Sequence, residues 1–231
     1  MIFKTEAEFE VAMIAALQNK GWENHVLKYP TEKDLLKNWA DILFENNRGI
    51  DRLNDAPLTD TEMQQILEQV TALRTPLKLN GFINGKTVSI TRDNPDDSLH
   101  LGKEVGLKIY DRREIAAGQS RYQIAQQPKF RSASKILGDR RGDLMLLING
   151  MPVFHVELKK TGIPVSQAYH QIEKYSEEGT FTGIFSLVQI FVAMQPEETV
   201  YFTNPGPDGF FNKDFYFHWA DFNNEPINNW K

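Results

Sequence analysis

The strongest constraint on the fold is a predicted hairpin in the middle of the chain. Its first strand, Leu144–Ile148, is a run of five apolar residues between Gly142 and the dipeptide Asn149-Gly150. A short apolar run between turn residues indicates a strand that is buried on both faces, and Asn-Gly is a strong hairpin turn signal. The chain is therefore expected to fold around a central sheet that contains this strand.

The second strand of the hairpin alternates in polarity, which places Glu157 and Lys159 on one face, roughly 6–7 Å apart. A two-residue loop would put Asp143 opposite Val156, on the other face of the sheet. A three-residue loop ending at Met151 would instead put Asp143 opposite Glu157, with Cβ atoms about 5 Å apart. We predict the longer loop or an equivalent bulge, because only these alignments bring the two acids together.

Two adjacent carboxylates repel each other unless a cation lies between them. Mg²⁺ takes oxygen ligands and keeps several waters, so Asp143, Glu157 and the carbonyl of Leu158 would suffice to bind it. Lys159 could orient an attacking water or balance the charge that develops on a phosphate. The alternative is an ordinary hairpin with a surface Glu-Lys pair, since Asp…Glu-x-Lys occurs by chance in many proteins.

The remaining periodicity predicts helices before and after a set of strands. The first helix starts with a capping-box pattern at Thr5 and stops before Gly21. Further helices are expected over residues 32–46, 60–73 and 164–178, and strands over residues 85–90, 105–110, 122–126, 187–193 and 199–202. This order predicts an α/β or α+β fold, a mixed central sheet flanked by helices. We expect one domain over 1–231, with a mainly helical part (1–80), a sheet core (81–205) and a tail (206–231).

Composition and charge argue against several classes of protein. The chain has no cysteine, no apolar run near the ~18 residues of a membrane span and an acidic N-terminus, so a cytoplasmic location is expected. Its net charge of -5 argues against a general nucleic-acid coat protein. Residues 103–141, however, contain ten Lys or Arg and four acids. This segment is either a phosphate-contacting strip or a solvated face, and charge alone leaves both open.

Five further residues have a functional and an ordinary interpretation. Gln171 and Tyr175 are four apart on the predicted helix 164–178 and would share one flank. They could reach the site, or be a surface glutamine and a core-edge aromatic residue. His155 could be a ligand or a base, or could fill the sheet surface. Arg140 and Arg141 could contact phosphate, or form salt bridges with nearby acids.

These motifs together resemble a known family. The residues that carry the resemblance are Asp143, Asn149-Gly150-x-Pro152, Glu157-Leu158-Lys159 and Gln171-x-x-x-Tyr175. The pattern is similar to the nuclease domain of the type I restriction enzyme R (motor) subunit, which belongs to the restriction-endonuclease-like superfamily with the signature Pro-Asp…(Asp/Glu)-x-Lys.

The resemblance implies a restriction-endonuclease-like core and Mg²⁺-dependent cleavage of duplex DNA. It implies these roles: Asp143 and Glu157 as metal ligands, Lys159 as the catalytic lysine, Gln171 and Tyr175 as an additional supporting motif, and Glu10 as an acid that approaches the metal. It also implies methylation and specificity subunits as partners, and ATP-driven translocation by the full-length subunit before cleavage.

The sequence departs from this pattern in two ways. Gly142 stands where the superfamily signature has proline, a position that sets backbone shape rather than chemistry. The chain also carries no Walker-type Gly-x-x-x-x-Gly-Lys-(Ser/Thr) motif, so we expect a fragment that lacks the ATP-driven part. A stand-alone repair or recombination nuclease of the same fold is one alternative, and a non-catalytic DNA-binding or assembly module is another.

Overall fold

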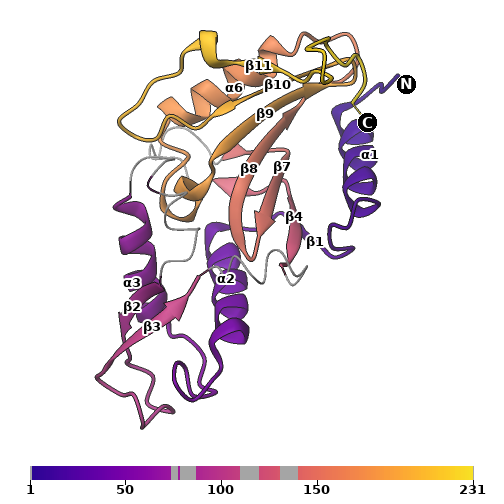
Figure 1. The fold of residues 1–231 in the computed structure, drawn as a ribbon. Coiled ribbons are helices and arrows are strands. Elements are labelled where there is room, and N and C mark those ends of the chain that lie inside the picture. Colours follow the sequence, from indigo (N-terminus) through magenta and orange to yellow (C-terminus); the bar gives the residue numbers. More distant parts are fainter. Residues whose placement is uncertain (1, 74–77, 79–86, 110–119, 131–139, 231) are drawn as a thin grey trace.

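The computed structural model describes residues 2–73, 78, 87–109, 120–130 and 140–230. A mixed seven-stranded sheet runs through the middle, with strand order β1-β4-β7-β8-β9-β10-β11, and helices lie against both faces (Figure 1). The strands of this sheet are β1 (Val26–Lys28), β4 (Tyr122–Gln126), β7 (Leu144–Ile148), β8 (Met151–Leu158), β9 (Ile190–Gln195), β10 (Glu198–Thr203) and β11 (Phe217–His218). The predicted fold class, α/β with a mixed central sheet, is confirmed.

Threonine side chains begin the three N-terminal helices. Thr5 Oγ1 accepts a hydrogen bond from Glu8 N at 3.1 Å, although the Glu8 carboxylate accepts from Lys4 N rather than completing the box. Thr31 and Thr59 have complete capping boxes. The helices are α1 (Glu6–Gln18), α2 (Glu32–Asn47), α3 (Asp60–Thr71) and α6 (Ser166–Glu177), with short 3-10 helices η1 (Gly183–Leu187) and η2 (Lys213–Phe215). None of the helices in the described ranges is long and apolar enough to cross a membrane.

Strand direction changes across the sheet. β1 is parallel to β4 and β8 is parallel to β9, whereas the other neighbours are antiparallel. A parallel pair needs a crossover connection, and α6 with η1 forms the crossover between β8 and β9. The first four residues of β7 are buried, because this strand lies between β4 and β8 with helices on both sides. The predicted doubly buried strand is therefore confirmed.

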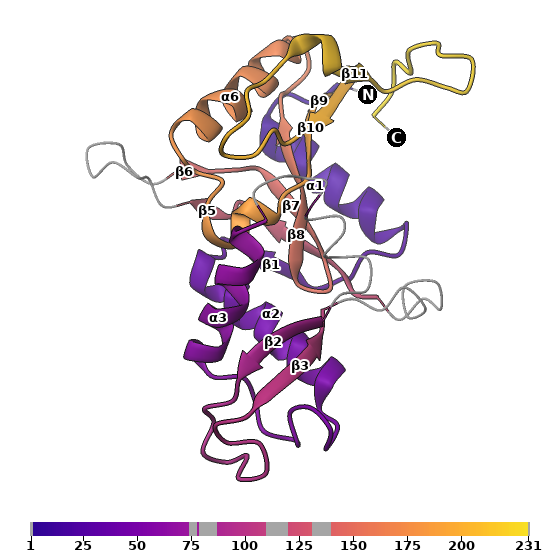
Figure 2. The same cartoon turned by 60° about the vertical axis from the view of Figure 1, so that its left-hand side comes forward.

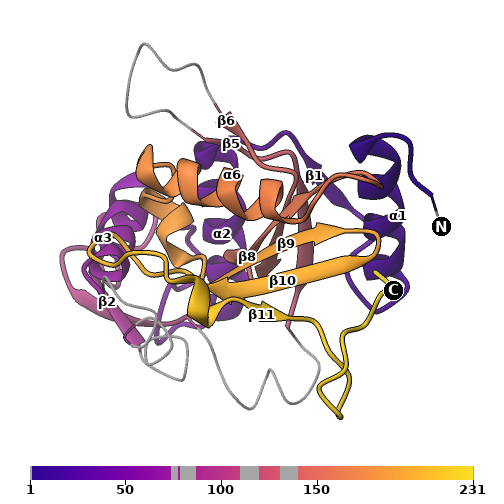
Figure 3. The same ribbon diagram turned by 90° about the horizontal axis from the view of Figure 1, so that it is seen from above.

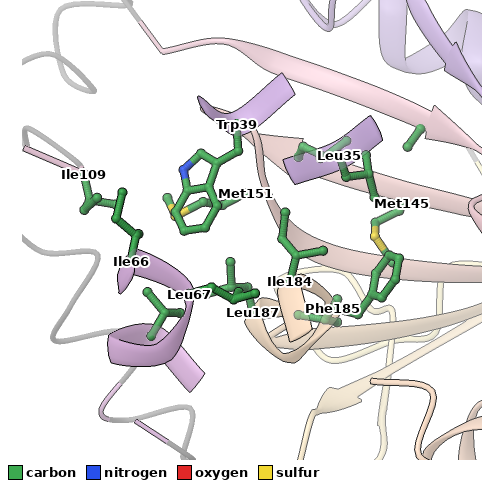
Figure 4. Packing of buried hydrophobic residues seen from close by; sticks show 14 of the residues in the cluster. Leu35, Trp39, Ile66, Leu67, Ile109, Met145, Met151, Ile184, Phe185 and Leu187 are labelled. Carbon is green, nitrogen blue, oxygen red and sulfur yellow. The ribbon is translucent and has the colours of Figure 1, made fainter. Parts of the chain in front are cut away.

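Each face of the sheet has its own hydrophobic cluster. Leu144 and Val156 point to the face that α1 covers, where Phe9 is wholly buried. Met145 points to the opposite face, where α2, α3, α6 and η1 enclose a larger cluster, part of which Figure 4 shows around Trp39. Figures 2 and 3 show α1 on the other side of the strands from α6. Alternation along β7 thus joins two helical layers to one sheet.

A separate two-stranded sheet packs against α3. It consists of β2 (Thr87–Thr91) and β3 (Glu104–Lys108), so the strands predicted over 85–90 and 105–110 are present but stand outside the central sheet. Residues 85, 86 and 110 of these predictions lie outside the described residues. Arg92 ties this hairpin to the helix. Its guanidinium is wholly buried and forms ion pairs with Glu62 of α3 at 2.5 Å and with Asp97 at 3.0 Å.

Several short elements were not predicted. β1 forms one edge of the central sheet within the part expected to be mainly helical, and β11 adds an edge strand from the tail. The predicted strand at 187–193 begins later, at Ile190, because η1 occupies the preceding residues. A small sheet of β5 (Lys129–Phe130) and β6 (Arg140–Arg141) extends from β4 and β7. Near the chain's end, the Trp230 ring packs edge-on against Phe3 and Phe9.

Candidate active site

The hairpin β7–β8, called the site hairpin below, turns in two residues. Asn149 (φ 51°) and Gly150 (φ 83°) both adopt left-handed conformations, and Ile148 pairs with Met151. Two positive φ values are typical of the type I′ turn that Asn-Gly favours. A Cβ on Gly150 would lie 2.9 Å from the Cα of Trp39, so the turn also packs directly on α2. The predicted three-residue loop is therefore wrong.

A β-bulge nevertheless produces the predicted alignment. The pairing shifts by one residue of β8 between Leu146 and Leu147 of β7. Pro152 lies at this irregularity, where a residue without an N–H can be accommodated in a buried strand. Beyond the bulge, the residue before β7, Asp143, comes level with Glu157. The equivalent bulge that we predicted as the alternative to the longer loop is confirmed.

Asp143 and Glu157 meet at the end of the site hairpin. Asp143 Oδ2 accepts a hydrogen bond from Leu158 N at 2.7 Å, which directs the side chain across to β8. Glu157 is wholly buried and Asp143 partly so. Burial and the charge of Glu157 raise the pKa of Asp143 well above its usual range, and burial raises the pKa of Glu157 to about 8. The pair is unfavourable when both acids are ionised, and a proton or a cation relieves it.

Both oxygens of Glu157 have partners. Oε1 lies 3.0 Å from His155 Nε2, and Oε2 accepts a hydrogen bond from Gln171 Nε2 at 2.8 Å. Tyr175, one turn along α6 from Gln171, contacts the same amide and donates its hydroxyl hydrogen to the carbonyl of Arg141 at 3.0 Å. The predicted pair on one flank of α6 thus reaches the site, and the surface-glutamine alternative is wrong.

His155 is more than a filler of the sheet surface. Its ring is wholly buried among Phe130, Phe181 and Phe191 and contacts Glu157 through Nε2. Burial lowers the pKa of His155 to about 4, so the ring is neutral. Gly142 allows the ring to lie there, because a Cβ on Gly142 would come within 2.3 Å of His155 Cε1. Gly142 stands where the superfamily signature has proline, and in this chain the ring of His155 leaves no room there for a side chain.

Lys159 lies next to the two acids and is nearly buried. Its Nζ donates to the carbonyl of Leu158 at 3.0 Å and lies 3.5 Å from Glu6 Oε1. The ammonium group is therefore hydrogen-bonded to the same carbonyl oxygen that we predicted as a third metal ligand. The contact with Glu6 was not predicted, because nothing in the spacing of α1 indicates that its first turn reaches the site hairpin.

Glu10 reaches the edge of the site through glutamine side chains. The Glu10 carboxylate is buried and accepts hydrogen bonds from Gln126 and Gln127. Gln127 (φ 50°) in turn donates its backbone N–H to the carbonyl of Asp143 at 2.8 Å. Glu10 is thus linked to Asp143 through one residue. Its predicted approach to a metal stays a prediction.

The two arginines before the site differ in their contacts. Arg140 forms a two-point ion pair with Glu178, with N–O distances of 2.8 and 2.9 Å, which agrees with the salt-bridge interpretation. Arg141 is exposed, and its guanidinium lies over the ring of Tyr29, 5.9 Å from the centroid. Arg141 therefore remains available to a phosphate. Part of the basic segment 103–141 lies outside the described residues.

The donor set can be compared with the needs of a divalent cation. Within the ranges that the structure describes, no three His, Asp or Glu side chains are grouped to hold a metal ion. Asp143 and Glu157 form a buried, mutually repelling pair of carboxylates, and such a pair fits a hard cation that takes one or two carboxylates and keeps several waters. The site therefore suits Mg²⁺ better than an ion that requires a full protein cage.

Comparison with known proteins identifies a family. The sequence profile described as "Type I restriction enzyme R protein N terminus" matches residues 3–210 of this chain.

Three relatives illustrate the similarity. The chain is 32% identical over 228 residues to the type I restriction enzyme SsaAORF53P endonuclease subunit of Staphylococcus saprophyticus, and 31% identical over 232 residues to the SauMSSORF170P endonuclease subunit of Staphylococcus aureus. Each match covers 99% of this chain and 22% of the relative, so the chain spans about a fifth of their length. The EcoprrI endonuclease subunit of Escherichia coli is 27% identical, with 99% of this chain and 68% of that protein covered.

Proposed function

The chain belongs to the family of the type I restriction enzyme R protein N terminus, and from this premise we propose that it is the endonuclease domain of such a subunit. It would hydrolyse phosphodiester bonds of duplex DNA with the help of Mg²⁺. One observation carries the proposal: Asp143 is level with Glu157 across the site hairpin, with Lys159 immediately beside them.

Asp143 and Glu157 are the residues that would hold the metal. Once bound, Mg²⁺ would polarise the phosphodiester and lower the pKa of a water molecule. The raised pKa values of the two acids support this assignment, because a cation replaces the proton that the pair otherwise retains.

The surrounding residues have supporting tasks. Gln171 holds Glu157 through Oε2, and the backbone N–H of Leu158 holds Asp143, so both carboxylates are oriented before substrate arrives. Lys159 would orient the attacking water or balance charge on the phosphate, which requires its ammonium group to leave the Leu158 carbonyl. Tyr175 steadies the backbone just before Asp143 by its bond to Arg141.

The proposal extends to a larger assembly. We propose that the full-length subunit cleaves after ATP-driven translocation by a motor outside this chain, and that methylation and specificity subunits supply sequence recognition. The relatives are each named as an endonuclease subunit of a type I restriction enzyme and are longer than this chain. A cytoplasmic location fits a protein that acts on intracellular DNA.

Metal binding and plasmid nicking test the proposal. Calorimetric titration with Mn²⁺ or Mg²⁺ is expected to show binding by the wild-type chain, loss of binding in Asp143→Ala and retained binding in Lys159→Ala. Lys159→Ala is expected to abolish metal-dependent nicking. Asp96→Ala and Lys20→Ala change exposed residues of the same types outside the site and should match wild type.

Two results of the metal titrations would contradict the proposal. If the wild-type chain binds no divalent metal, or if Asp143→Ala binds it equally well, the carboxylate pair is not a metal site. The non-catalytic DNA-binding or assembly module would then be the better description.

A further inference from the structure

His155 occupies a position that an apolar residue would fill more easily. The ring is wholly buried and is surrounded by Phe130, Phe181 and Phe191, with centroid distances of 5.2 to 6.2 Å. Among the described residues its one polar contact is with Glu157, and its Nδ1 is buried without a hydrogen-bond partner there. A buried polar atom without a partner is unfavourable, so packing alone does not account for a histidine here.

The environment of the ring indicates which nitrogen carries the proton. With the proton on Nε2, the ring donates to Glu157 Oε1 and leaves Nδ1 as an unpaired acceptor. With the proton on Nδ1, a buried donor would be left unpaired, and Nε2 would face an oxygen of Glu157 that is also an acceptor in the ionised form that a metal requires. The first tautomer satisfies the stronger interaction, so His155 holds Glu157 as a neutral donor.

Gly142 and His155 fit together across the site hairpin. A Cβ on Gly142 would lie 2.3 Å from His155 Cε1 and 3.1 Å from Nδ1, so the ring fills the space that a side chain would need. Gly142 is the neighbour of Asp143, and His155 lies two residues before Glu157. The ring of His155, on β8, therefore lies in the space beside the residue that precedes Asp143, close to the two acids.

We propose that His155 is a positioning residue, which holds the Glu157 carboxylate toward Asp143 through its Nε2–H, and that Gly142 provides the space this ring requires. The inference rests on the proposed function, since it concerns the ligands of the proposed metal. With Gln171 on Oε2 and His155 on Oε1, the carboxylate is fixed from two sides. Such outer-shell hydrogen bonds typically change metal affinity 10- to 100-fold when they are removed.

The test compares two substitutions of similar length, one with a donor and one without. His155→Gln keeps an amide N–H that can reach Glu157, whereas His155→Met has a similar shape and no donor. Mn²⁺ affinity, measured by calorimetry, is expected to fall at least tenfold in His155→Met and to stay within about threefold of wild type in His155→Gln. Phe181→Leu, which trims a neighbouring ring, should lower Tm and leave Mn²⁺ affinity unchanged.

A second pair of variants tests the same contact from the opposite strand, should His155→Met fail to fold. Gly142→Ala is expected to lower both Tm and Mn²⁺ affinity, because the new methyl group displaces the ring. Adding His155→Ala removes the 2.3 Å contact but leaves the new methyl group 3.1 Å from Phe130 Cε2, so the double variant should regain part of the lost Tm but not the affinity.

The outcomes separate this inference from the proposed function. If wild type binds Mn²⁺ and Asp143→Ala does not, the metal site stands. If His155→Met or Gly142→Ala/His155→Ala then binds as wild type does, the positioning role of His155 is overturned and the metal site is not. If the wild-type chain binds no metal, the proposed function fails and this inference fails with it.

Discussion

At the scale of single residues, Asp143 and Glu157 are placed where two charges are hard to accommodate. The structure holds them with a backbone N–H, an amide and an imidazole, but none of these donors neutralises a full negative charge. The charge of Lys159 lowers both pKa values, yet burial outweighs it. In the metal-free chain the pair is therefore expected to lower the stability of the fold.

Removing one charge should consequently stabilise the metal-free chain. In Asp143→Asn the amide oxygen can still accept from Leu158 N, while the repulsion with Glu157 disappears. We expect stability to rise by about 1 kcal/mol, or a Tm increase of about 2–4 °C, together with loss of Mg²⁺ binding. Differential scanning calorimetry in EDTA measures the first effect. A lower Tm would show that the two acids do not repel each other in the folded chain.

The same acids should make stability depend on pH. Because Glu157 has a raised pKa of about 8, the folded chain keeps a proton that the unfolded chain has already released above its usual value of 4.5. Stability in EDTA should therefore fall as pH rises from 6.5 to 8, by at most about 1.4 kcal/mol per pH unit for one proton. His155 acts in the opposite direction, but only below its usual value of 6.5.

Urea unfolding at several pH values between 6.5 and 8 measures this slope. Glu157→Gln should flatten it, and saturating Mg²⁺ should abolish the decline in wild type, since the cation replaces the proton. Equal slopes in EDTA for wild type and Glu157→Gln would assign the pH dependence to other groups.

The sequence predicted most of the side chains that meet at the site. Asp143, Glu157 and Lys159 could be recognised because strand periodicity relates them within one hairpin. The contacts of Glu6, and the fit of Gly142 to His155, could not be predicted. They depend on how α1 and the small β5–β6 sheet pack on the site hairpin, and this packing produces no periodic pattern in the sequence.

At the scale of elements, the alignment of the site hairpin depends on a β-bulge that the sequence indicates only weakly. Asn149-Gly150 correctly indicates a turn, and on its own it would have placed Asp143 on the wrong face. Pro152, a residue that disrupts regular pairing, is the one local signal of the bulge. A single unpaired residue thus decides on which face of β7 the acid lies.

The β2–β3 hairpin depends on one buried arginine, and replacing it should be costly. Arg92→Met leaves Glu62 and Asp97 buried without their partner, and breaking a buried ion pair typically costs about 3–5 kcal/mol. Arg48→Met is the matched control, because Arg48 and its acidic partners are half exposed or more and such pairs contribute at most about 1 kcal/mol.

Chemical denaturation of both variants gives the comparison, and Mn²⁺ titration should show unchanged affinity in each. A loss for Arg92→Met no larger than that for Arg48→Met would mean that the hairpin does not need this ion pair. A loss of metal affinity would mean that the hairpin and the site are coupled.

At the scale of the whole molecule, the order of the strands could not be predicted. β1 has three residues and pairs with β4, about a hundred positions away in the chain. Such pairing leaves no local periodicity. The parallel pair β8–β9 could be inferred more readily, because a helix of suitable length joins its strands. The class of fold therefore follows from local patterns, whereas its edges depend on long-range packing.

The charge of the whole molecule leads to a last prediction, on DNA binding. A chain with net charge -5 needs locally placed cations to approach DNA, and Arg141 is exposed beside Gly142 and Asp143. Replacing one phosphate-contacting arginine should reduce the slope of log K against log salt concentration by about 1.

Anisotropy titrations of a labelled duplex between 50 and 200 mM KCl, with Ca²⁺ in place of Mg²⁺, measure this slope. Arg141→Gln should show the reduced slope and Arg140→Gln a smaller change, because Arg140 is paired with Glu178. Equal slopes for wild type and Arg141→Gln would place the DNA on another face of the molecule.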